Sequence, residues 1–255
     1  MVIRLSAGKK INMETKVKNV TLVNSWFDWF VSLMLAASIW LFLMFFHDWR
    51  GKAFSVFTAG KCFGISAVVI ISLTLFLGFL ARRSSRIAPW LYLRRPFGMT
   101  GVYFVVAHIG LSLLVLQQNF PWQYYLDHPL STVCAILATL LFLGVLTSSF
   151  PAAFKKLGAN NWKKLQTASY LALLLSLIHF ASLDKFPNWI NWFKTFKPSV
   201  WLPPGTMPPF LFGVLVLLCA LIERLFLNRK FTASGINGCG HDVKNETQSG
   251  ATKLT

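Results

Sequence analysis

Acidic residues are the scarcest chemical class in this chain. Only 8 of its 255 residues are Asp or Glu, against 25 Lys and Arg, and the formal net charge is +17. All charged residues together make up 13% of the sequence and apolar residues 55%, whereas ordinary globular domains carry roughly 25% charged residues. This composition excludes an ordinary soluble domain. The 24 Phe and 10 Trp residues also exclude a disordered chain, because disordered segments contain few aromatic residues.

A continuous basic surface is also missing. A net charge this positive can indicate a nucleic-acid-binding protein. The cations of this chain, however, stand in short clusters between long apolar runs, and no soluble segment gathers them on one face. We therefore expect no nucleic-acid partner. The lipid bilayer is the expected partner, with the basic clusters lying beside anionic lipid head groups.

Motifs of nucleotide and metal chemistry are missing as well. No G-x-G-x-x-G follows a strand, no phosphate-binding loop occurs, and no soluble stretch could form a flavin or nicotinamide domain. The cysteines Cys62, Cys134, Cys219 and Cys239 are single and far apart, without zinc spacing. Cys239 and His241 lie close together near the C-terminus, but two ligands do not make a metal site. We expect no NAD(P)H chemistry from this chain alone.

Six apolar stretches are long enough to cross a bilayer as helices, which takes about 20 residues each. They are Ser25–Phe46, Cys62–Leu80, Phe97–Leu116, Leu130–Thr147, Gln166–Leu183 and Pro209–Leu227. The predicted fold is an all-α polytopic membrane bundle over residues 25–228, between a basic tail (1–24) and a flexible tail (229–255). The tails and the loops after the second and fourth stretches, counted together with Arg224 near the end of the sixth stretch, hold 19 Lys and Arg, against 6 in the other loops. The positive-inside rule then predicts that both termini are cytoplasmic.

The loop after the fifth stretch is rich in aromatic residues. Its apolar residues recur at steps of three and four, as on one face of a short helix lying in the outer membrane interface: Phe186, Trp189, Ile190, Phe193 and Phe196. Two interpretations remain open. The segment is either a plain membrane-belt loop or a shelf that receives an extracytoplasmic protein.

Ionisable residues inside a membrane are costly and usually functional, and the sequence places only two of them deeply, His108 and His179. Asp28 and Glu223 lie within a turn or two of the cytoplasmic ends of their helices, where we expect them to reach water. The remaining histidines fall in predicted loops or tails and are interpreted as ordinary surface residues: His47, His128 and His241.

The depth of the two deep histidines is matched. His108 follows Arg95 by 13 residues and His179 follows Lys164 by 15, so at ~1.5 Å per residue both lie ~20 Å above the inner basic residues. Two neutral imidazoles at one level can supply both axial ligands of a haem iron. A structural hydrogen-bonding pair and a proton or substrate relay are the alternatives.

A small residue precedes each of these histidines by about two helical turns and lies on nearly the same face of the helix. Gly101 stands seven residues before His108, and Ala172 stands seven residues before His179. Small side chains there would leave room for a flat macrocycle, and they also serve ordinary contact between helices. We include both positions in the predicted haem site.

Several fragments, taken in their order and spacing, resemble the ferric reductase-like transmembrane domain. The closest variant is the MsrQ-type haem-binding membrane subunit of bacterial periplasmic methionine sulfoxide reductase systems. The resemblance covers roughly residues 58–182. It is carried by Thr58-Ala59-Gly60, Arg94-Arg95-Pro96-Phe97-Gly98, His108, Thr147-Ser148-Ser149, Leu157-Gly158-Ala159-Asn160-Asn161-Trp162-Lys163-Lys164-Leu165, Tyr170 and Ile178-His179.

The resemblance implies a six-helix bundle of the cell inner (plasma) membrane that holds haem b between the third and fifth helices. His108 and His179 match the outer ligand pair of that family. The inner pair is replaced, because Gln166 stands where the family motif has histidine and Arg94 stands fourteen residues before His108. The implied cofactor is therefore one haem b at the outer level. A quinone or flavin as a further cofactor is left undetermined.

The function that the resemblance implies is electron transfer rather than catalysis by the chain itself. The donor would be a membrane quinol or a reduced cytoplasmic flavoprotein, and the acceptor a periplasmic oxidoreductase. Arg50, Lys52 and Lys61 on the outer side would neutralise the haem propionates. A non-redox scaffold that keeps the fold without its ligands is the alternative, and a small transporter is a third and weaker hypothesis.

Overall fold

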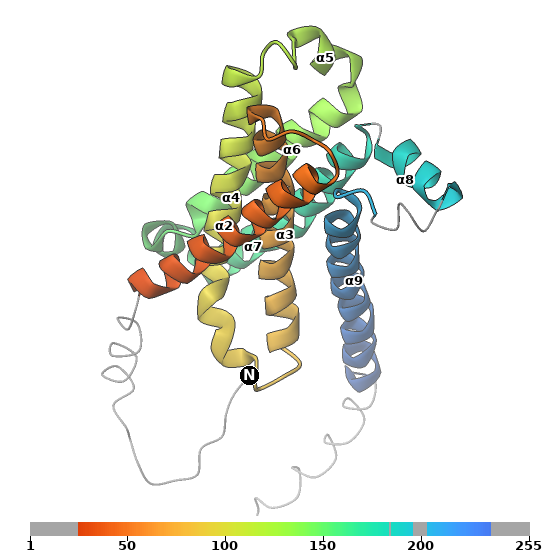
Figure 1. The fold of residues 1–255 in the computed structure, drawn as a ribbon. Helices are drawn as coiled ribbons and strands as arrows, with labels where there is room; N and C mark the ends of the chain where they lie inside the picture. The colour runs from red at the N-terminus through yellow and green to blue at the C-terminus, as the bar shows by residue number, and fades with distance from the viewer. Residues whose placement is uncertain (1–24, 184, 196–202, 236–255) are drawn as a thin grey trace, which may run out of the picture.

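The computed structural model describes residues 25–183, 185–195 and 203–235, and within these ranges it contains helices and no strand. The long helices are α2 (Ser25–Trp49), α3 (Val56–Ala81), α4 (Arg94–Gly110), α6 (Pro129–Ser148), α7 (Pro151–Ala181) and α9 (Met207–Gly235) (Figure 1). The shorter elements are the 3₁₀ helix η1 (Ala88–Leu93), the π-helical segment η2 (Leu111–Val115), α5 (Trp122–Asp127) and α8 (Lys185–Lys194).

Helices long and apolar enough to cross a membrane account for most of the fold. Five segments qualify by length and composition: Trp26–Trp49, Val56–Ala81, Ala88–Val115, Pro129–Ser148 and Met207–Leu225. A sixth is counted if Asn160–Ala181 and Lys185–Lys194, which meet at an angle of 67°, form one broken span. The described part of the chain is thus that of an all-helical, multi-pass membrane protein with five or six candidate spans. The predicted spans coincide with these helices, apart from the bend after the fifth.

Local sequence explains several helix boundaries. The Ser55 side chain accepts a hydrogen bond from the Thr58 backbone N–H and so caps the start of α3. Proline stands at the first helical position of both α6 and α7, where its missing N–H costs nothing. Inside α7, Gly158 has φ +72° and ψ 161° and breaks the helix into two parts. Only glycine adopts that conformation without strain.

Helix α3 lies at the centre of the bundle. It contacts α2, α4, α7 and α9, and it is the most buried of the candidate spans. The main apolar core joins side chains of α3, α4, α6, α7 and α9: Ile71, Leu75, Val102, Ala138, Phe142, Ala172, Leu173, Leu177 and Val216. A buried hydrogen bond of 2.8 Å between the hydroxyls of Ser32 and Thr100 connects α2 to α4. This packing fixes the lateral positions of the helices that carry the two deep histidines.

The helices α4 and α7, which carry these histidines, are both packed against α3 and α6. The most extensive contacts in the structure are those between α6 and α7 and between α3 and α4. No comparable contact joins α4 directly to α7 within the described residues. The two helices are therefore neighbours across the bundle, with α3 and α6 on either side.

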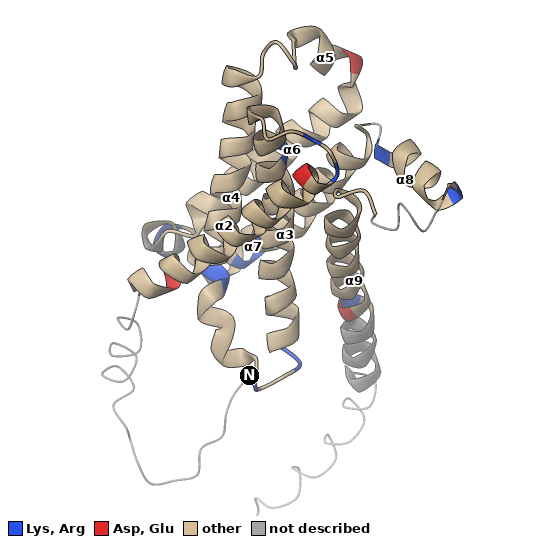
Figure 2. Cartoon of the chain, viewed as in Figure 1, with Lys and Arg blue, Asp and Glu red and all other residues tan. Residues whose placement is uncertain are grey.

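The two ends of the bundle differ in composition. Figure 2 shows Lys and Arg at the turn between α3 and η1 and at the start of α4, whereas α5 lies at the opposite end of these helices (Figures 1 and 2).

The helix predicted in the loop after the fifth span is α8. Its Trp189 is buried and packs against Phe180 and Phe210, while Phe186, Ile190 and Phe193 are exposed. Phe196 lies outside the described residues.

Several helix boundaries differ from the sequence prediction. Helix α3 begins at Val56 instead of Cys62, and α7 begins at Pro151 instead of Gln166. Helix α2 continues to Trp49, three residues past the predicted end at Phe46. The third span ends in the π-helical turn of η2. Helix α9 continues to Gly235, because Asn228, Arg229 and Lys230 are compatible with a helix and the first glycine after Gly213 is Gly235. The predicted tail 1–24, Cys239 and His241 lie outside the described residues.

Candidate functional site

His108 lies on α4 with its imidazole directed at α3. Its Nδ1 atom is 2.8 Å from the carbonyl oxygen of Gly60. A carbonyl oxygen can only accept a hydrogen bond, so Nδ1 carries the proton and donates it. The other ring nitrogen, Nε2, then keeps its lone pair. This is the tautomer in which histidine can bind a metal through Nε2.

His179 lies on α7 and is oriented in the same way by α6. Its Nδ1 atom is 3.0 Å from the carbonyl oxygen of Ser131 and 2.8 Å from the Ser131 hydroxyl. The Ser131 hydroxyl donates to the carbonyl oxygen of His179 at 3.2 Å. Two interactions therefore fix the ring, and both leave Nε2 with its lone pair. Within the described part of the chain, no hydrogen bond is made by Nε2 of either histidine.

Both histidines lie toward the same end of the bundle, His108 near the end of α4 and His179 near the end of α7. They come from helices that do not pack directly on each other, and each Nδ1 is held by the neighbouring helix, α3 in one case and α6 in the other. A macrocycle between two imidazoles needs such a pair of separated backbones. The residues present therefore fit a bis-histidine haem in the choice of donor atoms, because each imidazole keeps Nε2 as a possible ligand.

Three residues that position the histidines were not identified from the sequence. They are Gly60 and Ser131, which supply the acceptors, and Gly64, against which the His108 ring packs. A Cβ added at Gly64 would lie 3.2 Å from three ring carbons of His108. Glycines at positions 60 and 64 of an apolar helix were a possible signal, since glycine inside a helix often marks a close approach.

Gly101 and Ala172, the small residues of the predicted site, both lie in the apolar core. A Cβ added at Gly101 would be 2.7 Å from Cγ1 of Ile71, so α3 and α4 approach closely there. Ala172 is fully buried among the core residues of α3, α6 and α9. These contacts correspond to the helix-packing alternative for both positions. Clearance for a macrocycle remains a prediction.

The outer cations of the predicted site have contacts of their own. Arg50 donates a hydrogen bond to the carbonyl oxygen of Pro203. The Lys61 ammonium lies 3.7 Å from the centre of the Phe57 ring, and Lys61 directly follows Gly60 on α3. Lys61 is therefore the cation placed nearest in sequence to the backbone that orients His108. Lys52 is exposed.

His47 is buried, which corrects its interpretation as a surface histidine. Its exposed fraction is 7%, its Nδ1 atom lies 2.8 Å from the carbonyl oxygen of Leu43, and Cys62 Sγ is 4.0 Å away. The reason is the longer α2, which carries His47 on a helical face toward α3 instead of in a loop. His128 does lie at the junction of α5 and α6, where Nδ1 is 3.0 Å from the carbonyl oxygen of Tyr124. Cys62 and Cys134 are free and buried.

Glu223 is likewise buried rather than in contact with water. Its exposed side-chain fraction is 11%, and it accepts two hydrogen bonds from Arg82, at 2.8 Å from Nε and 2.6 Å from Nη2. The hydrogen bond with Glu223 raises the pKa of the Arg82 guanidinium above its ordinary value. This bidentate pair joins the end of α3 to α9 and explains why a carboxylate is tolerated inside the bundle.

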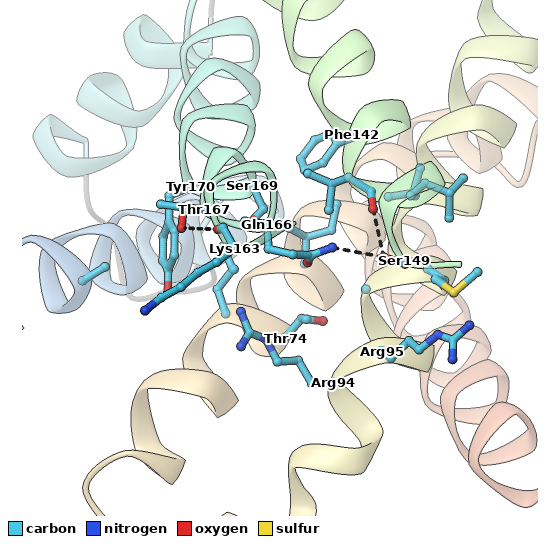
Figure 3. A pocket seen from close by; sticks show the side chains of 18 of the residues that line it. Thr74, Arg94, Arg95, Phe142, Ser149, Lys163, Gln166, Thr167, Ser169 and Tyr170 are labelled. Carbon is cyan, nitrogen blue, oxygen red and sulfur yellow. Dashed lines mark hydrogen bonds between the residues drawn. The ribbon is translucent and has the colours of Figure 1, made fainter. Parts of the chain in front are cut away.

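The positions that replace the inner ligands of the resemblance come together in space. Arg94 and Gln166 line one cavity of about 770 Å³ between α3, α4, α6, α7 and α9 (Figure 3). The Gln166 amide donates to the Ser148 hydroxyl at 2.9 Å. Neither arginine nor this hydrogen-bonded amide is a usual haem ligand, so the residues present do not fit an inner bis-histidine haem.

Clusters of three or more His, Cys, Asp or Glu side chains do not occur within the described ranges. A haem held by two imidazoles needs no third protein ligand. Comparison with known protein families finds no family profile that matches this chain, and comparison with curated protein sequences finds no significant match.

Proposed function

We propose that this chain is a haem b-binding electron-transfer subunit of the cell inner membrane, with both termini cytoplasmic. It holds one haem between His108 and His179 and passes electrons from a quinol or reduced flavin to a periplasmic oxidoreductase. One observation carries the proposal. Each imidazole donates its Nδ1 proton to a backbone carbonyl of a neighbouring helix, at 2.8 Å for His108 and 3.0 Å for His179.

This arrangement is the usual support of a metal-binding histidine. The acceptor fixes the tautomer and the ring orientation and makes the free nitrogen a better ligand. A purely structural histidine gains as much from hydrogen bonds at either nitrogen. In this chain the same nitrogen is engaged in both histidines, and the same nitrogen is left free. His47 and His128 also engage Nδ1, but with a carbonyl only four residues earlier in the chain. What supports two axial ligands is that His108 and His179 are each held by a neighbouring helix, which fixes the ring relative to the bundle.

The chain itself would contribute binding, orientation and exclusion of water. A bound haem supplies one-electron chemistry that no side chain of this protein offers. Gly60 and Ser131 hold the two rings. Lys61 lies on the turn of α3 next to Gly60, where its charge would balance a propionate. No catalytic residue is proposed, because the reaction with substrate would belong to the periplasmic partner.

The decisive experiment is an absorption spectrum of the purified full-length protein, reduced with dithionite and quantified for haem per chain. We expect sharp reduced bands at one haem per chain, and loss of these bands in both His108→Ala and His179→Ala. His128→Ala is the matched control, because His128 lies outside the spans, and it should keep the full spectrum. An unchanged spectrum in either of the first two variants would refute the ligand pair.

A second candidate is a non-redox scaffold of the same fold. Two observations favour it: Arg94 and Gln166 replace the inner ligands, and Gly101 is in close contact with Ile71 instead of facing open space. Under this hypothesis the protein is colourless when it is expressed with ample haem, and neither histidine variant changes its binding to partners.

A further inference from the structure

The inner cavity has a charged part and an apolar part. Its volume is about 770 Å³, within the usual range for sites that bind small molecules. Arg94 from α4 and Gln166 from α7 point into it, and Lys163 and Tyr170 lie on the same helix as Gln166 (Figure 3). Residues of every long helix except α2 line the cavity.

Positive charge in this cavity exceeds negative charge. Arg82, Arg94, Arg95, Lys163 and Arg224 contribute to the lining, and Glu223 is the one acidic residue among them. The charge of Glu223 is already matched by its bidentate pair with Arg82. The other four cations of the lining have no carboxylate partner within the described residues.

Arg94 is the cation best placed to bind a ligand. Its guanidinium lies against the backbone of α3, where a Cβ added at Gly78 would be 3.2 Å from its Cζ and Nη1 atoms. Among the described residues it forms no ion pair or hydrogen bond. A half-buried guanidinium of this kind retains its full set of donors, whose planar arrangement suits the oxygens of a phosphate.

The other wall of the cavity is apolar. Ile71, Leu75, Val102 and Phe142 line the cavity and belong to the main core cluster of the bundle. A small inorganic anion would leave this wall without contacts. A ligand with both an anionic head and an apolar body would contact the arginine and the apolar wall together.

We propose that this cavity binds an amphiphilic phosphate ester, the head group and upper chain of an acidic phospholipid from the cytoplasmic leaflet. Basic pockets between transmembrane helices are where such head groups bind. A quinol has no charge and would leave Arg94 without a partner, and a haem would find neither an imidazole nor a thiolate there. The leaflet rests on the proposed orientation of the bundle, but the proposal does not depend on the haem at His108 and His179.

Native mass spectrometry of the full-length protein in detergent tests this proposal. Phosphatidylglycerol and phosphatidylcholine are titrated against the wild type, Arg94→Gln and Arg86→Gln. Arg86 is exposed and outside the cavity, so it is the matched control. We expect phosphatidylglycerol to bind about tenfold more weakly to Arg94→Gln, the loss of one charge-assisted contact, and equally to the wild type and Arg86→Gln.

Three results would overturn the proposal. They are equal binding of the two lipids, equal effects of Arg94→Gln and Arg86→Gln, and a second haem per chain that is lost with Arg94→Gln. If Arg94→Gln fails to fold, Lys163→Gln replaces it, because Lys163 is exposed and lines the same cavity. Its expected loss is about threefold, as for one solvent-screened charge.

A soluble anion is distinguished by titration with glycerol 3-phosphate. Displacement of phosphatidylglycerol only at large molar excess supports the lipid as the ligand. Arg94-dependent binding of glycerol 3-phosphate without any retained phosphatidylglycerol would overturn the lipid assignment. The haem spectrum of each variant is recorded in parallel. A colourless protein that still selects phosphatidylglycerol would contradict the proposed function alone.

Discussion

The Nδ1 atom of His108 lies 2.8 Å from the carbonyl oxygen of Gly60, so a backbone atom of α3 determines the orientation of a ring on α4. The carbonyl cannot be removed by substitution. The geometry of the site therefore depends on how closely α3 and α4 approach each other, and that approach is set by the small residues between them. Gly64 is the residue that touches the ring.

We predict that Gly64→Ala perturbs a haem bound at His108 without unfolding the protein. The added methyl group would lie 3.2 Å from three ring carbons, and the imidazole must move by a few tenths of an ångström. The expected result is a shifted reduced spectrum and a changed redox potential at near-normal expression. Spectro-electrochemistry of the purified variant measures both.

Gly110→Ala is the control for this substitution. It replaces a glycine of α4, the helix that carries His108, but nothing lies within 4 Å of the added Cβ. Its spectrum and potential should match the wild type. Equal behaviour of Gly64→Ala and Gly110→Ala would mean that the His108 ring does not bind a cofactor in the orientation described above.

We predict a smaller effect for Ser131→Ala. The substitution removes the hydroxyl 2.8 Å from Nδ1 of His179 but keeps the carbonyl oxygen at 3.0 Å. Loss of a supporting hydrogen bond usually lowers metal affinity by about 10–100-fold. Because the carbonyl acceptor remains in this variant, we expect its haem affinity to fall by about tenfold or less. Haem dissociation to apomyoglobin measures the change. Ser176→Ala, whose hydroxyl bonds only within α7, should leave the rate unchanged.

The spans were predictable because a stretch of about 20 apolar residues can be recognised from its own sequence, whichever helices it packs against. The five helices that qualify as spans individually all coincide with predicted stretches. A short helix lying in the membrane interface was predicted after the fifth span, and α8 is that helix, but the angle between α7 and α8 was not predicted. Pro187 and the polar residues before it give a reason for a break but not for its angle of 67°.

The acceptors of the histidines were not predictable, because they depend on lateral packing. The depth of His108 and His179 follows from residue counting along each helix. Which residue of α3 or α6 lies opposite each ring depends on helix rotation, and a sequence with no alignment does not give that. His47 shows the same limit, since one additional turn of α2 converts a predicted loop residue into a buried one.

We predict that Gly158→Ala destabilises the protein by roughly 1–3 kcal/mol, the usual cost of forcing a side chain into a backbone conformation reserved for glycine. The backbone at Gly158 has φ +72°, and nothing within 4 Å would clash with the added Cβ. The cost would therefore be conformational rather than steric. Unfolding in increasing SDS, followed by circular dichroism, measures it.

The control for Gly158→Ala is Gly144→Ala in α6. The added Cβ would make an ordinary 3.8 Å contact with Leu165, inside a regular helix. Alanine is the better helix former there, and we expect no loss of stability. A destabilisation at Gly144 as large as that at Gly158 would contradict the role of the positive φ angle.

The pair between Arg82 and Glu223 gives a prediction about stability alone. Arg82→Met would leave a buried carboxylate without a partner. Removing one member of a buried pair costs about 3–5 kcal/mol. Because the Arg82 side chain is 47% exposed, solvent screening reduces the expected loss to roughly 1–3 kcal/mol. SDS unfolding of the purified protein again provides the measurement.

The double variant Arg82→Met/Glu223→Leu should recover most of that stability, because it leaves no buried charge behind. Glu223 raises the pKa of Arg82 above its ordinary, already strongly basic value, so the guanidinium stays charged and its contribution to stability is complete throughout the neutral and mildly alkaline range. The loss caused by Arg82→Met should therefore be the same between about pH 7 and pH 9. A double variant as unstable as Arg82→Met would show that Arg82 acts through contacts other than those with Glu223.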